Sequence, residues 1–382
     1  MKALVTLTVG LVLGGYATLS QADIKIGVTL CTTGPAASLG IPVKNGLQLL
    51  PHSIAGENIE WIILDDATDP TAASRNARKL VSEDNVDLLI GSNITPNSLA
   101  VLEVAAESQT PAIPIAGASV LVTPMDAKRR WMFKVPQNES LMAKAIFGHM
   151  AKNGVKTAGY IGFNDGYGES WWKETQEAAD AFGIKLIVSE RYGKTDTSVT
   201  GQVLKIIAAK PDAVLIGGAG TPAALPQIAL KQHGYNGKIY QTHGVANNDF
   251  LRVGGKDVEG AFLPVGPVQV LEQLPVSHPA QKPGKEFVQA YEAKYGPGTA
   301  NGFGAYSWDL GIWLKAAIPV ALKSARPGTK EFRAALRDAL ESMKNVVGSH
   351  GVYNLSPADH NGLDERGRVM VTIQGGKWKL VE

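Results

Sequence analysis

Five short loops of this sequence combine glycine or other small residues with hydroxyl, amide, aromatic or imidazole groups. They span residues 91–98, 116–119, 166–168, 217–220 and 243–244, and each follows a short apolar run. The apolar runs read as β-strands, and open α/β sheets bind ligands at the carboxyl ends of their strands. Each loop taken alone is better explained as an ordinary strand-to-helix turn. Their joint occurrence indicates a ligand site.

In the first of these loops, Asn93 and Thr95 are polar residues placed where a strand passes into a helix. We predict Thr95 as the N-cap and Pro96 as the first helical residue. The loop would then point the free N–H groups of a helix N-terminus out of the sheet, where small anions bind. The Thr95 hydroxyl would add a donor. An ordinary capped helix would show the same pattern.

Two other loops suit the close approach of a ligand. The small residues Ala116, Gly117 and Ala118 would leave backbone N–H and C=O groups accessible. Tyr167 lies between two glycines, so an open loop would present its ring to a ligand. These loops predict binding through backbone groups and an aromatic surface.

Signatures of catalysis, metal binding and dinucleotide binding are missing. The sequence has no HExxH helix, no Walker loop and no GxSxG elbow. The aspartates at 65, 66 and 69 lack the glycine and terminal glutamate of a calcium loop, so we predict surface or capping carboxylates. The loop at 217–220 lacks the third glycine of a dinucleotide fingerprint. We therefore expect a non-enzyme with no cofactor and no metal. A hydrolase using His243 or Cys31 remains the alternative.

Composition and charge favour a globular protein without a nucleic-acid partner. Lys and Arg number 37 against 35 Asp and Glu, and residues 128–130 form the only basic cluster. Apolar residues make up 45% of the chain, which is enough for large cores. The lone Cys31 permits no internal disulfide, and we predict that it is a buried packing residue.

The N-terminus predicts export. Met1 and Lys2 precede an uncharged apolar stretch over 3–19, and small residues follow at 20 and 22. This pattern predicts a signal peptide over 1–22 that is cleaved before Asp23, which would place the mature protein in the periplasm. A membrane anchor is the alternative, although the apolar run is short for a span.

Short Val- and Ile-rich runs alternate with amphipathic runs along the mature chain. The predicted strands are 24–30, 59–64, 86–90, 112–115, 156–162, 185–191, 213–217 and 238–241. The predicted helices are 41–53, 70–83, 96–108, 167–182, 199–209, 222–233, 283–295, 304–324 and 329–342, with short strands near 352–354, 368–374 and 377–381. Continuous apolar strands separated by helices predict parallel sheets covered on both faces, here in two doubly wound α/β blocks.

With these elements in place, the mature chain resembles the leucine/isoleucine/valine-binding family of periplasmic ABC-importer receptors. The resemblance rests on residues 24–28, 33–35 with 40, 65–70, 90–96, 165–168, 243–247, 351–353, 356–357 and 359–362. It implies the type I binding-protein fold, with two lobes joined by a three-strand hinge. Residues 23–137 plus 267–350 would form lobe 1, and 138–266 plus 351–382 would form lobe 2.

The resemblance also implies how a ligand is held. Its carboxylate would meet a hydroxyl at the position of Thr95 and backbone groups around Ala116 and Ala118. Its amino group would meet a carboxylate at the position of His243. The candidate ligand-binding residues are Leu39, Asn93, Thr95, Ala116, Gly117, Ala118, Tyr167, Ala219 and His243.

This sequence departs from the family pattern at several of these positions. His243 cannot neutralise an ammonium and can itself become a cation, and Ala118 lacks a hydroxyl. Leu39 and Ala219 replace aromatic rings, which would make the pocket roomier and more apolar. The anchor for a carboxylate survives in part while the anchor for an amine is lost. We therefore favour an aromatic or other non-amino organic acid as the ligand, with a branched-chain or other amino acid as the alternative.

The expected function is transport binding: the two lobes close over one ligand, and the protein then docks on permease subunits that carry cytoplasmic ATPases. We expect a monomer. A sensor domain of the same fold, without transport, is the second alternative.

Overall fold

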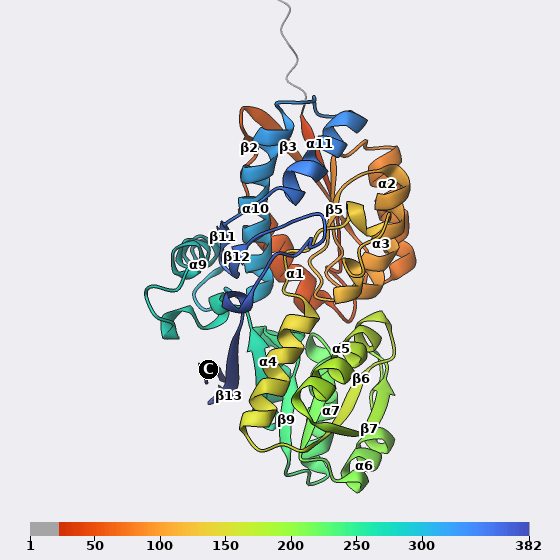
Figure 1. The fold of residues 1–382 in the computed structure, drawn as a ribbon, viewed down its shortest axis with the longest axis vertical. Helices are drawn as coiled ribbons and strands as arrows, with labels where there is room; N and C mark the ends of the chain where they lie inside the picture. Colours follow the sequence, from red (N-terminus) through yellow and green to blue (C-terminus); the bar gives the residue numbers. More distant parts are fainter. Residues whose placement is uncertain (1–22, 382) are drawn as a thin grey trace, which may run out of the picture.

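The computed structural model describes residues 23–381, which form two α/β lobes arranged along the long axis of the molecule (Figure 1). The predicted signal peptide, residues 1–22, lies outside the described residues. Among the residues that are described, no helix is both long and apolar enough to cross a membrane.

The first lobe is built around a five-stranded sheet of order β2-β3-β1-β4-β5. Its first run of elements is β1 (Ile24–Leu30), α1 (Ala37–Leu47), β2 (Ser53–Ile54), β3 (Glu57–Asp65), α2 (Pro70–Ser82), β4 (Leu88–Ile90), α3 (Thr95–Ser108) and β5 (Ala112–Ile113). Strand β1 pairs in parallel with β3 and β4 and is buried along nearly its whole length, because helices cover both faces of the sheet. The N-terminus of helix α2 could be predicted because its first residues carry capping signals. The Asp69 side chain accepts the Ala72 N–H at 2.6 Å, and Pro70 takes the first turn.

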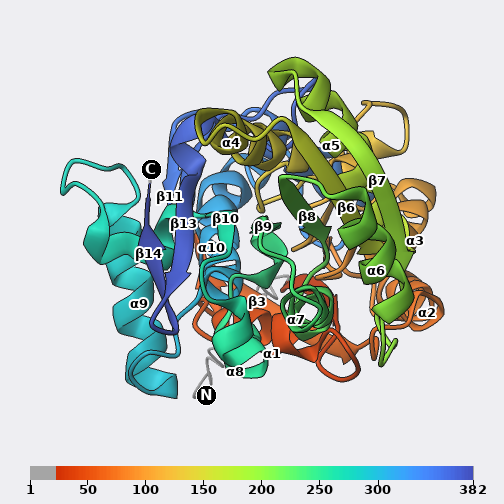
Figure 2. The ribbon, with the colours of Figure 1, turned by 90° about the horizontal axis from the view of Figure 1, so that it is seen from below.

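The second lobe is built around a seven-stranded sheet of order β14-β13-β10-β9-β8-β6-β7. Its central elements are α4 (Glu139–Lys152), β6 (Thr157–Phe163), α5 (Gly166–Phe182), β7 (Lys185–Tyr192), α6 (Thr200–Ala209), β8 (Ala213–Gly217), α7 (Ala224–Gln232), β9 (Lys238–Gln241), α8 (Asn248–Gly254) and β10 (Phe262–Val265). Strands β7, β6, β8, β9 and β10 are parallel, whereas β13 and β14 add an antiparallel edge. Figure 2 shows α4 and α5 on one face of this sheet and α7 on the other.

The C-terminal third completes both lobes. Helices α9 (Gln281–Tyr295), α10 (Gly302–Ala321) and α11 (Lys330–Glu341) return to the first lobe, where Leu310 and Trp313 of α10 share one core with Ile26 and Val28 of β1. The hairpin β11 (Val346–Gly348) and β12 (Gly351–Tyr353) follows, and β13 (Val369–Gln374) and β14 (Lys377–Leu380) then join the second sheet.

Residues 351–363, which the sequence-based division placed in lobe 2, contact the first lobe. Tyr353 and Leu355 belong to the first-lobe core. The Asn361 amide donates to the backbone carbonyls of Lys134 and Pro136, both at 2.8 Å. The chain therefore reaches the second sheet only at β13.

Asp309 of α10 anchors the turn between β11 and β12, where His350 lies against Gly266 of the crossover after β10. Its fully buried side chain accepts the N–H of Ser349 at 2.6 Å and of His350 at 3.0 Å. It also accepts the Tyr353 hydroxyl at 2.9 Å, and His350 Nδ1 lies 3.2 Å away. One carboxyl group thus satisfies several donors that would otherwise be buried without partners.

Gln137 connects two further crossing segments. Its side-chain nitrogen donates to the Gly367 carbonyl at 2.7 Å, and its side-chain oxygen accepts the Tyr306 hydroxyl at 2.7 Å. The Tyr306 ring stacks on His350 with 4.0 Å between ring centroids. The crossovers are therefore held by polar contacts centred on α10.

The prediction of two doubly wound lobes is confirmed, and most predicted elements are present with ends shifted by a few residues. The largest shift is α1, expected over 41–53 and found at Ala37–Leu47. Helices α4 and α8 and strands β2, β10 and β11 were not predicted.

The Asp309 contacts predict a large and specific stability effect. We expect Asp309→Asn to destabilise the protein by roughly 3 kcal/mol, because an amide cannot accept from all of these buried donors. Urea denaturation followed by tryptophan fluorescence measures this loss. Asp180→Asn on the exposed face of α5 is the control and should change stability by less than about 0.5 kcal/mol. Equal midpoints for the two variants would contradict the role assigned to Asp309.

Candidate functional site

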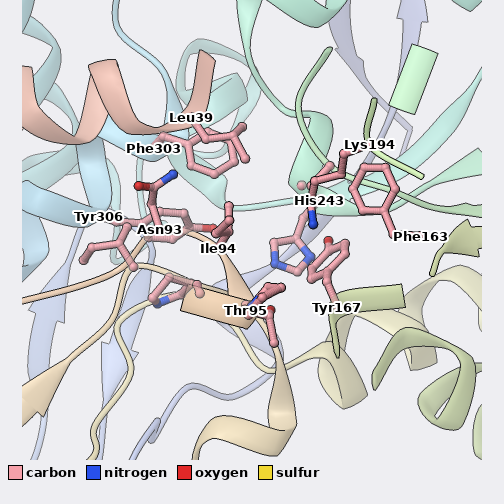
Figure 3. Close-up of a pocket in the computed structure, with 17 residues that line it drawn as sticks. Leu39, Asn93, Ile94, Thr95, Phe163, Tyr167, Lys194, His243, Phe303 and Tyr306 are labelled. Carbon is pink, nitrogen blue, oxygen red and sulfur yellow. The ribbon is translucent and has the colours of Figure 1, made fainter. Parts of the chain in front are cut away.

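A cavity of about 30 Å³ lies between the lobes at the carboxyl ends of the parallel strands. Figure 3 shows its lining side chains converging from both lobes. The lining residues are Leu39, Asn93, Ile94, Thr95, Pro96, Ile115, Ala116, Gly117, Pro136, Phe163, Tyr167, Lys194, Ala219, His243, Gly244, Phe303 and Tyr306.

Eight of the nine candidate residues from the sequence line this cavity: Leu39, Asn93, Thr95, Ala116, Gly117, Tyr167, Ala219 and His243. Ala118 does not. It is fully buried at the start of a short 3₁₀ helix (Ser119–Leu121), and its methyl group packs in the core near α3. The chain turns into that helix directly after Gly117, which carries the side chain away from the cavity.

The first lobe contributes two buried polar groups without partners. The Thr95 hydroxyl and the Asn93 side-chain nitrogen have no hydrogen-bond partner among the described residues. The other end of the Asn93 amide is fixed, because its oxygen accepts the Cys31 N–H at 2.8 Å. Our assignment of Thr95 as an N-cap was wrong: Ile94 occupies the N-cap and Thr95 is the first helical residue. The Thr95 hydroxyl is therefore not used in capping.

The second lobe places another helix N-terminus at the cavity. Asp165 caps α5 by accepting the N–H groups of Tyr167 and Gly168. Tyr167 thus belongs to the first turn of a helix rather than to the open loop that we expected. Its hydroxyl lies 2.9 Å from the Thr242 hydroxyl, which itself donates to the Gly218 carbonyl. The Tyr167 proton is therefore directed at Thr242, and a lone pair of Tyr167 remains free to accept.

His243 sits on a 3₁₀ turn (His243–Val245) after β9 and is buried. Burial lowers its pKa to about 3, and the nearby Lys134 charge adds to this effect. The imidazole is thus neutral at neutral pH and would become a cation only well below it. Its Nδ1 has no partner in the described chain.

Gly117 is in close contact with this ring. A Cβ atom at position 117 would lie 2.5 Å from His243 Nε2, which is far inside van der Waals contact. The absence of a side chain at Gly117 is therefore what lets His243 reach across from the second lobe.

Lys194 is the one cationic side chain in the cavity lining. It pairs with Asp165, and its ammonium lies 4.9 Å from the centroid of the Phe163 ring. Burial lowers the pKa of Lys194 to about 8. The lining itself contains no Asp or Glu, so the fixed charge facing the cavity is positive.

The sequence reasoning missed the aromatic wall and the cation. Phe303 and Tyr306 come from α10, which we treated only as a packing helix, and Figure 3 shows Phe303 beside Leu39. These rings restore aromatic surface where Leu39 and Ala219 had suggested a roomier space. The spacing of Phe303 and Tyr306 on one helix face was the available signal. No local pattern marked Lys194.

The described chain offers no other chemistry at this site. No group of three or more His, Cys, Asp or Glu within residues 23–381 could hold a metal ion. Cys31 is buried behind the cavity, 3.6 Å from the Ser92 hydroxyl, and burial raises the pKa of its thiol. A thiol in this state is unreactive.

The protonation state of His243 can be measured directly by NMR. Between pH 6.5 and about 3 the unfolded chain binds a proton at this position and the folded chain does not, so His243 lowers stability as pH falls through this window. We expect its ring C–H signal in ¹H–¹³C NMR spectra to stay constant from about pH 8 to pH 5. His243→Gln assigns the signal, and the exposed His233 provides a reference in the same spectra. A His243 signal that moves through a transition near neutral pH would contradict the neutral, buried ring.

Comparison with known proteins places this geometry in context. A family model described as a periplasmic binding protein matches residues 23–377. Leu/Ile/Val-binding protein homolog 3 of Brucella melitensis is 24% identical over 350 residues, which cover 90% of this chain and 89% of that protein. An extracellular ligand-binding receptor from Rhodopseudomonas palustris is 47% identical, with a TM-score of 0.91 over 94% of this chain and 100% of that chain.

A more distant structure shares the fold. The solute-binding protein of an ABC transporter from Rhodopseudomonas palustris, crystallised with benzoate, has a TM-score of 0.80 at 22% identity, covering 94% of this chain and 95% of that chain. Because the family model covers nearly the whole described chain, the protein belongs to the periplasmic binding protein family.

Proposed function

We propose that this protein binds a small non-amino carboxylic acid, preferably an aromatic one, in the cavity between its lobes. The observation that carries the proposal is the charge of the lining: one lysine and no carboxylate. The names of the relatives do not decide the ligand, because their identities are low or their ligands are not stated. The chemistry of the cavity supports the choice.

An amino acid ligand would bring an ammonium group into this space. A buried ammonium needs an anionic partner, because its desolvation otherwise costs several kcal/mol. Asp165 contacts the lining residues Tyr167 and Lys194, but it already accepts two backbone N–H groups and pairs with Lys194. His243 is neutral and offers at most one lone pair. An ammonium would therefore stay poorly compensated.

A carboxylate ligand, in contrast, would meet hydrogen-bond donors and the positive ends of helices. The N-termini of α3 and α5 face the cavity from the two lobes, and the positive ends of helix dipoles favour anions. The Thr95 hydroxyl and the Asn93 amide nitrogen are unpartnered donors, and Lys194 adds a charged one. These groups recognise an acceptor-rich anion.

The remaining lining is apolar and largely aromatic. Phe163, Tyr167, Phe303 and Tyr306 contribute rings, and Leu39 packs beside Phe303. Flat rings stack and pack edge-to-face against such walls. An acid whose body is an aromatic ring fits this lining better than a dicarboxylate, whose second charge would face apolar surface.

As an ABC-transporter binding protein, the chain would act outside the cytoplasm and deliver this acid to permease subunits with cytoplasmic ATPases. Cleavage of residues 1–22 as a signal peptide belongs to this proposal. Nothing in the cavity lining supports turnover, since no activated nucleophile faces the ligand space of the described chain. We therefore propose binding without catalysis.

The ligand class is tested by isothermal titration calorimetry of the mature protein. We expect benzoate or phenylacetate to bind more tightly than leucine, isoleucine or valine, because only the amino acids carry an ammonium. His243→Glu should weaken binding of the acid by placing a second negative charge beside it. Micromolar binding of leucine, with no binding of either aromatic acid, would return the protein to the amino-acid receptors.

Thr95→Val separates binding from folding. Valine keeps the shape of threonine and removes only the hydroxyl, which has no partner in the described chain. We expect the thermal stability of the free protein to be unchanged or slightly higher. Acid binding should weaken by roughly 1.5–3 kcal/mol, the range for a hydrogen bond to a charged group.

Thr175→Val is the matched control for this substitution. Thr175 is also fully buried with an unpartnered hydroxyl, but it lies in α5 away from the cavity lining. Calorimetry should show unchanged acid affinity for this variant. If Thr95→Val and Thr175→Val bind the acid equally well, the Thr95 hydroxyl is not a ligand donor.

A further inference from the structure

Lys134 is a buried lysine on the first crossover between the lobes, and burial lowers its pKa to about 7. Its side chain is fully buried, and it forms no ion pair with any residue that the structure describes. Its ammonium instead donates to two backbone carbonyls, that of Gly117 at 2.7 Å and that of Gln137 at 3.1 Å. Gly117 lines the cavity, whereas Lys134 does not, so the lysine lies behind the cavity wall.

The bond to Gly117 fixes the direction of a peptide group. The peptide between Gly117 and Ala118 is trans, so its C=O and N–H point in opposite directions. With the carbonyl held by Lys134, the Ala118 N–H points away from Lys134. No acceptor in the described chain takes the N–H of Ala116, Gly117 or Ala118.

The charge of Lys134 is incompletely compensated by its surroundings. Two carbonyl dipoles do not replace a carboxylate partner for a buried ammonium. The acidic groups nearest to it in electrostatic effect are Glu139, Asp359 and Glu174. One side-chain oxygen of Glu139 accepts the Ser119 N–H and the Ser170 hydroxyl, and the other has no hydrogen-bond partner among the described residues. An anion on the cavity side of Gly117 would be a further partner for this charge.

We propose that Lys134 is a positioning residue for the ligand carboxylate: it holds the Gly117–Ala118 peptide with its N–H toward the cavity and makes this wall positive from behind. The inference rests on the proposed function, because it needs an anionic ligand. It assigns a role to a residue that never touches the ligand. It also explains why Ala118 contributes through its backbone although its side chain is buried elsewhere.

The test compares an acid with its neutral amide. Calorimetric titration of the wild type and of Lys134→Met uses benzoate and benzamide as probes, which share the ring and differ in charge. We expect Lys134→Met to weaken benzoate binding about tenfold or more, as for the loss of one charge interaction across a poorly solvated wall. Benzamide binding should change less than about threefold. A merely structural defect would weaken both probes alike.

Glu139→Gln is the matched control. It perturbs the same buried cluster but keeps the bond from Lys134 to Gly117, so the preference for benzoate over benzamide should be retained. An unchanged preference in Lys134→Met, or an equal loss for both probes, would overturn the inference while leaving the proposed function intact. If the wild type binds neither benzoate nor benzamide, the aromatic-acid proposal fails and this inference fails with it.

A second measurement does not depend on the folding of any variant. In a crystal structure of the wild type with benzoate, the carboxylate should accept the Ala118 N–H while the Gly117 carbonyl stays on Lys134. A carboxylate bound away from the 116–118 backbone would contradict the positioning role.

Discussion

The turn between β11 and β12, which lies against the crossovers, depends on the buried carboxyl group of Asp309. The backbone N–H groups of this turn lie in an apolar region, where each would be costly without an acceptor. Asp309 supplies that acceptor to Ser349 and His350 and also binds Tyr353. Since the Asp309 side chain projects from the long core helix α10, the position of this turn follows from the packing of that helix in the first lobe.

Helix α10 also ties the hinge to the cavity. Tyr306 lies one turn before Asp309, lines the cavity, and donates its hydroxyl to Gln137 on the first crossover. Phe303, one turn earlier still, lines the same wall. A ligand that packs against these rings therefore contacts the element on which the crossovers depend. This is a direct physical route from ligand contact to the relative position of the lobes.

The closed cavity gathers donors that cannot satisfy one another. Thr95 and Asn93 come from the first lobe, and His243 and Lys194 from the second. Bringing these groups together without a ligand leaves several of them buried and unpaired, which opposes closure. A carboxylate between them provides acceptors for both sides. The same groups can therefore select the ligand and make closure conditional on it.

Much of the fold could be predicted from the sequence because strong local signals coincide. Strand β1 was predicted with both ends correct, since its apolar run is bounded by Asp23 on one side and polar residues on the other. The site was located through loops at strand ends, which a parallel sheet brings to one edge. Thr95 was misassigned as a cap because the sequence Ile94-Thr95-Pro96 fits an N-cap threonine equally well. Lys194 and Phe303 were missed because tertiary packing, and no local pattern, brings them to the cavity.

The contact between Gly117 and His243 links two positions that are distant in sequence and belong to different lobes. Any side chain at 117 would meet the imidazole of His243. Replacing His243 first by a shorter acidic residue would remove that clash. Replacing Gly117 first, while His243 is still present, would create it. An evolutionary path from this cavity to an amine-binding one would thus begin at 243, and only afterwards could 117 gain a hydroxyl. The contact between Gly117 and His243 therefore constrains the order in which these two residues can change.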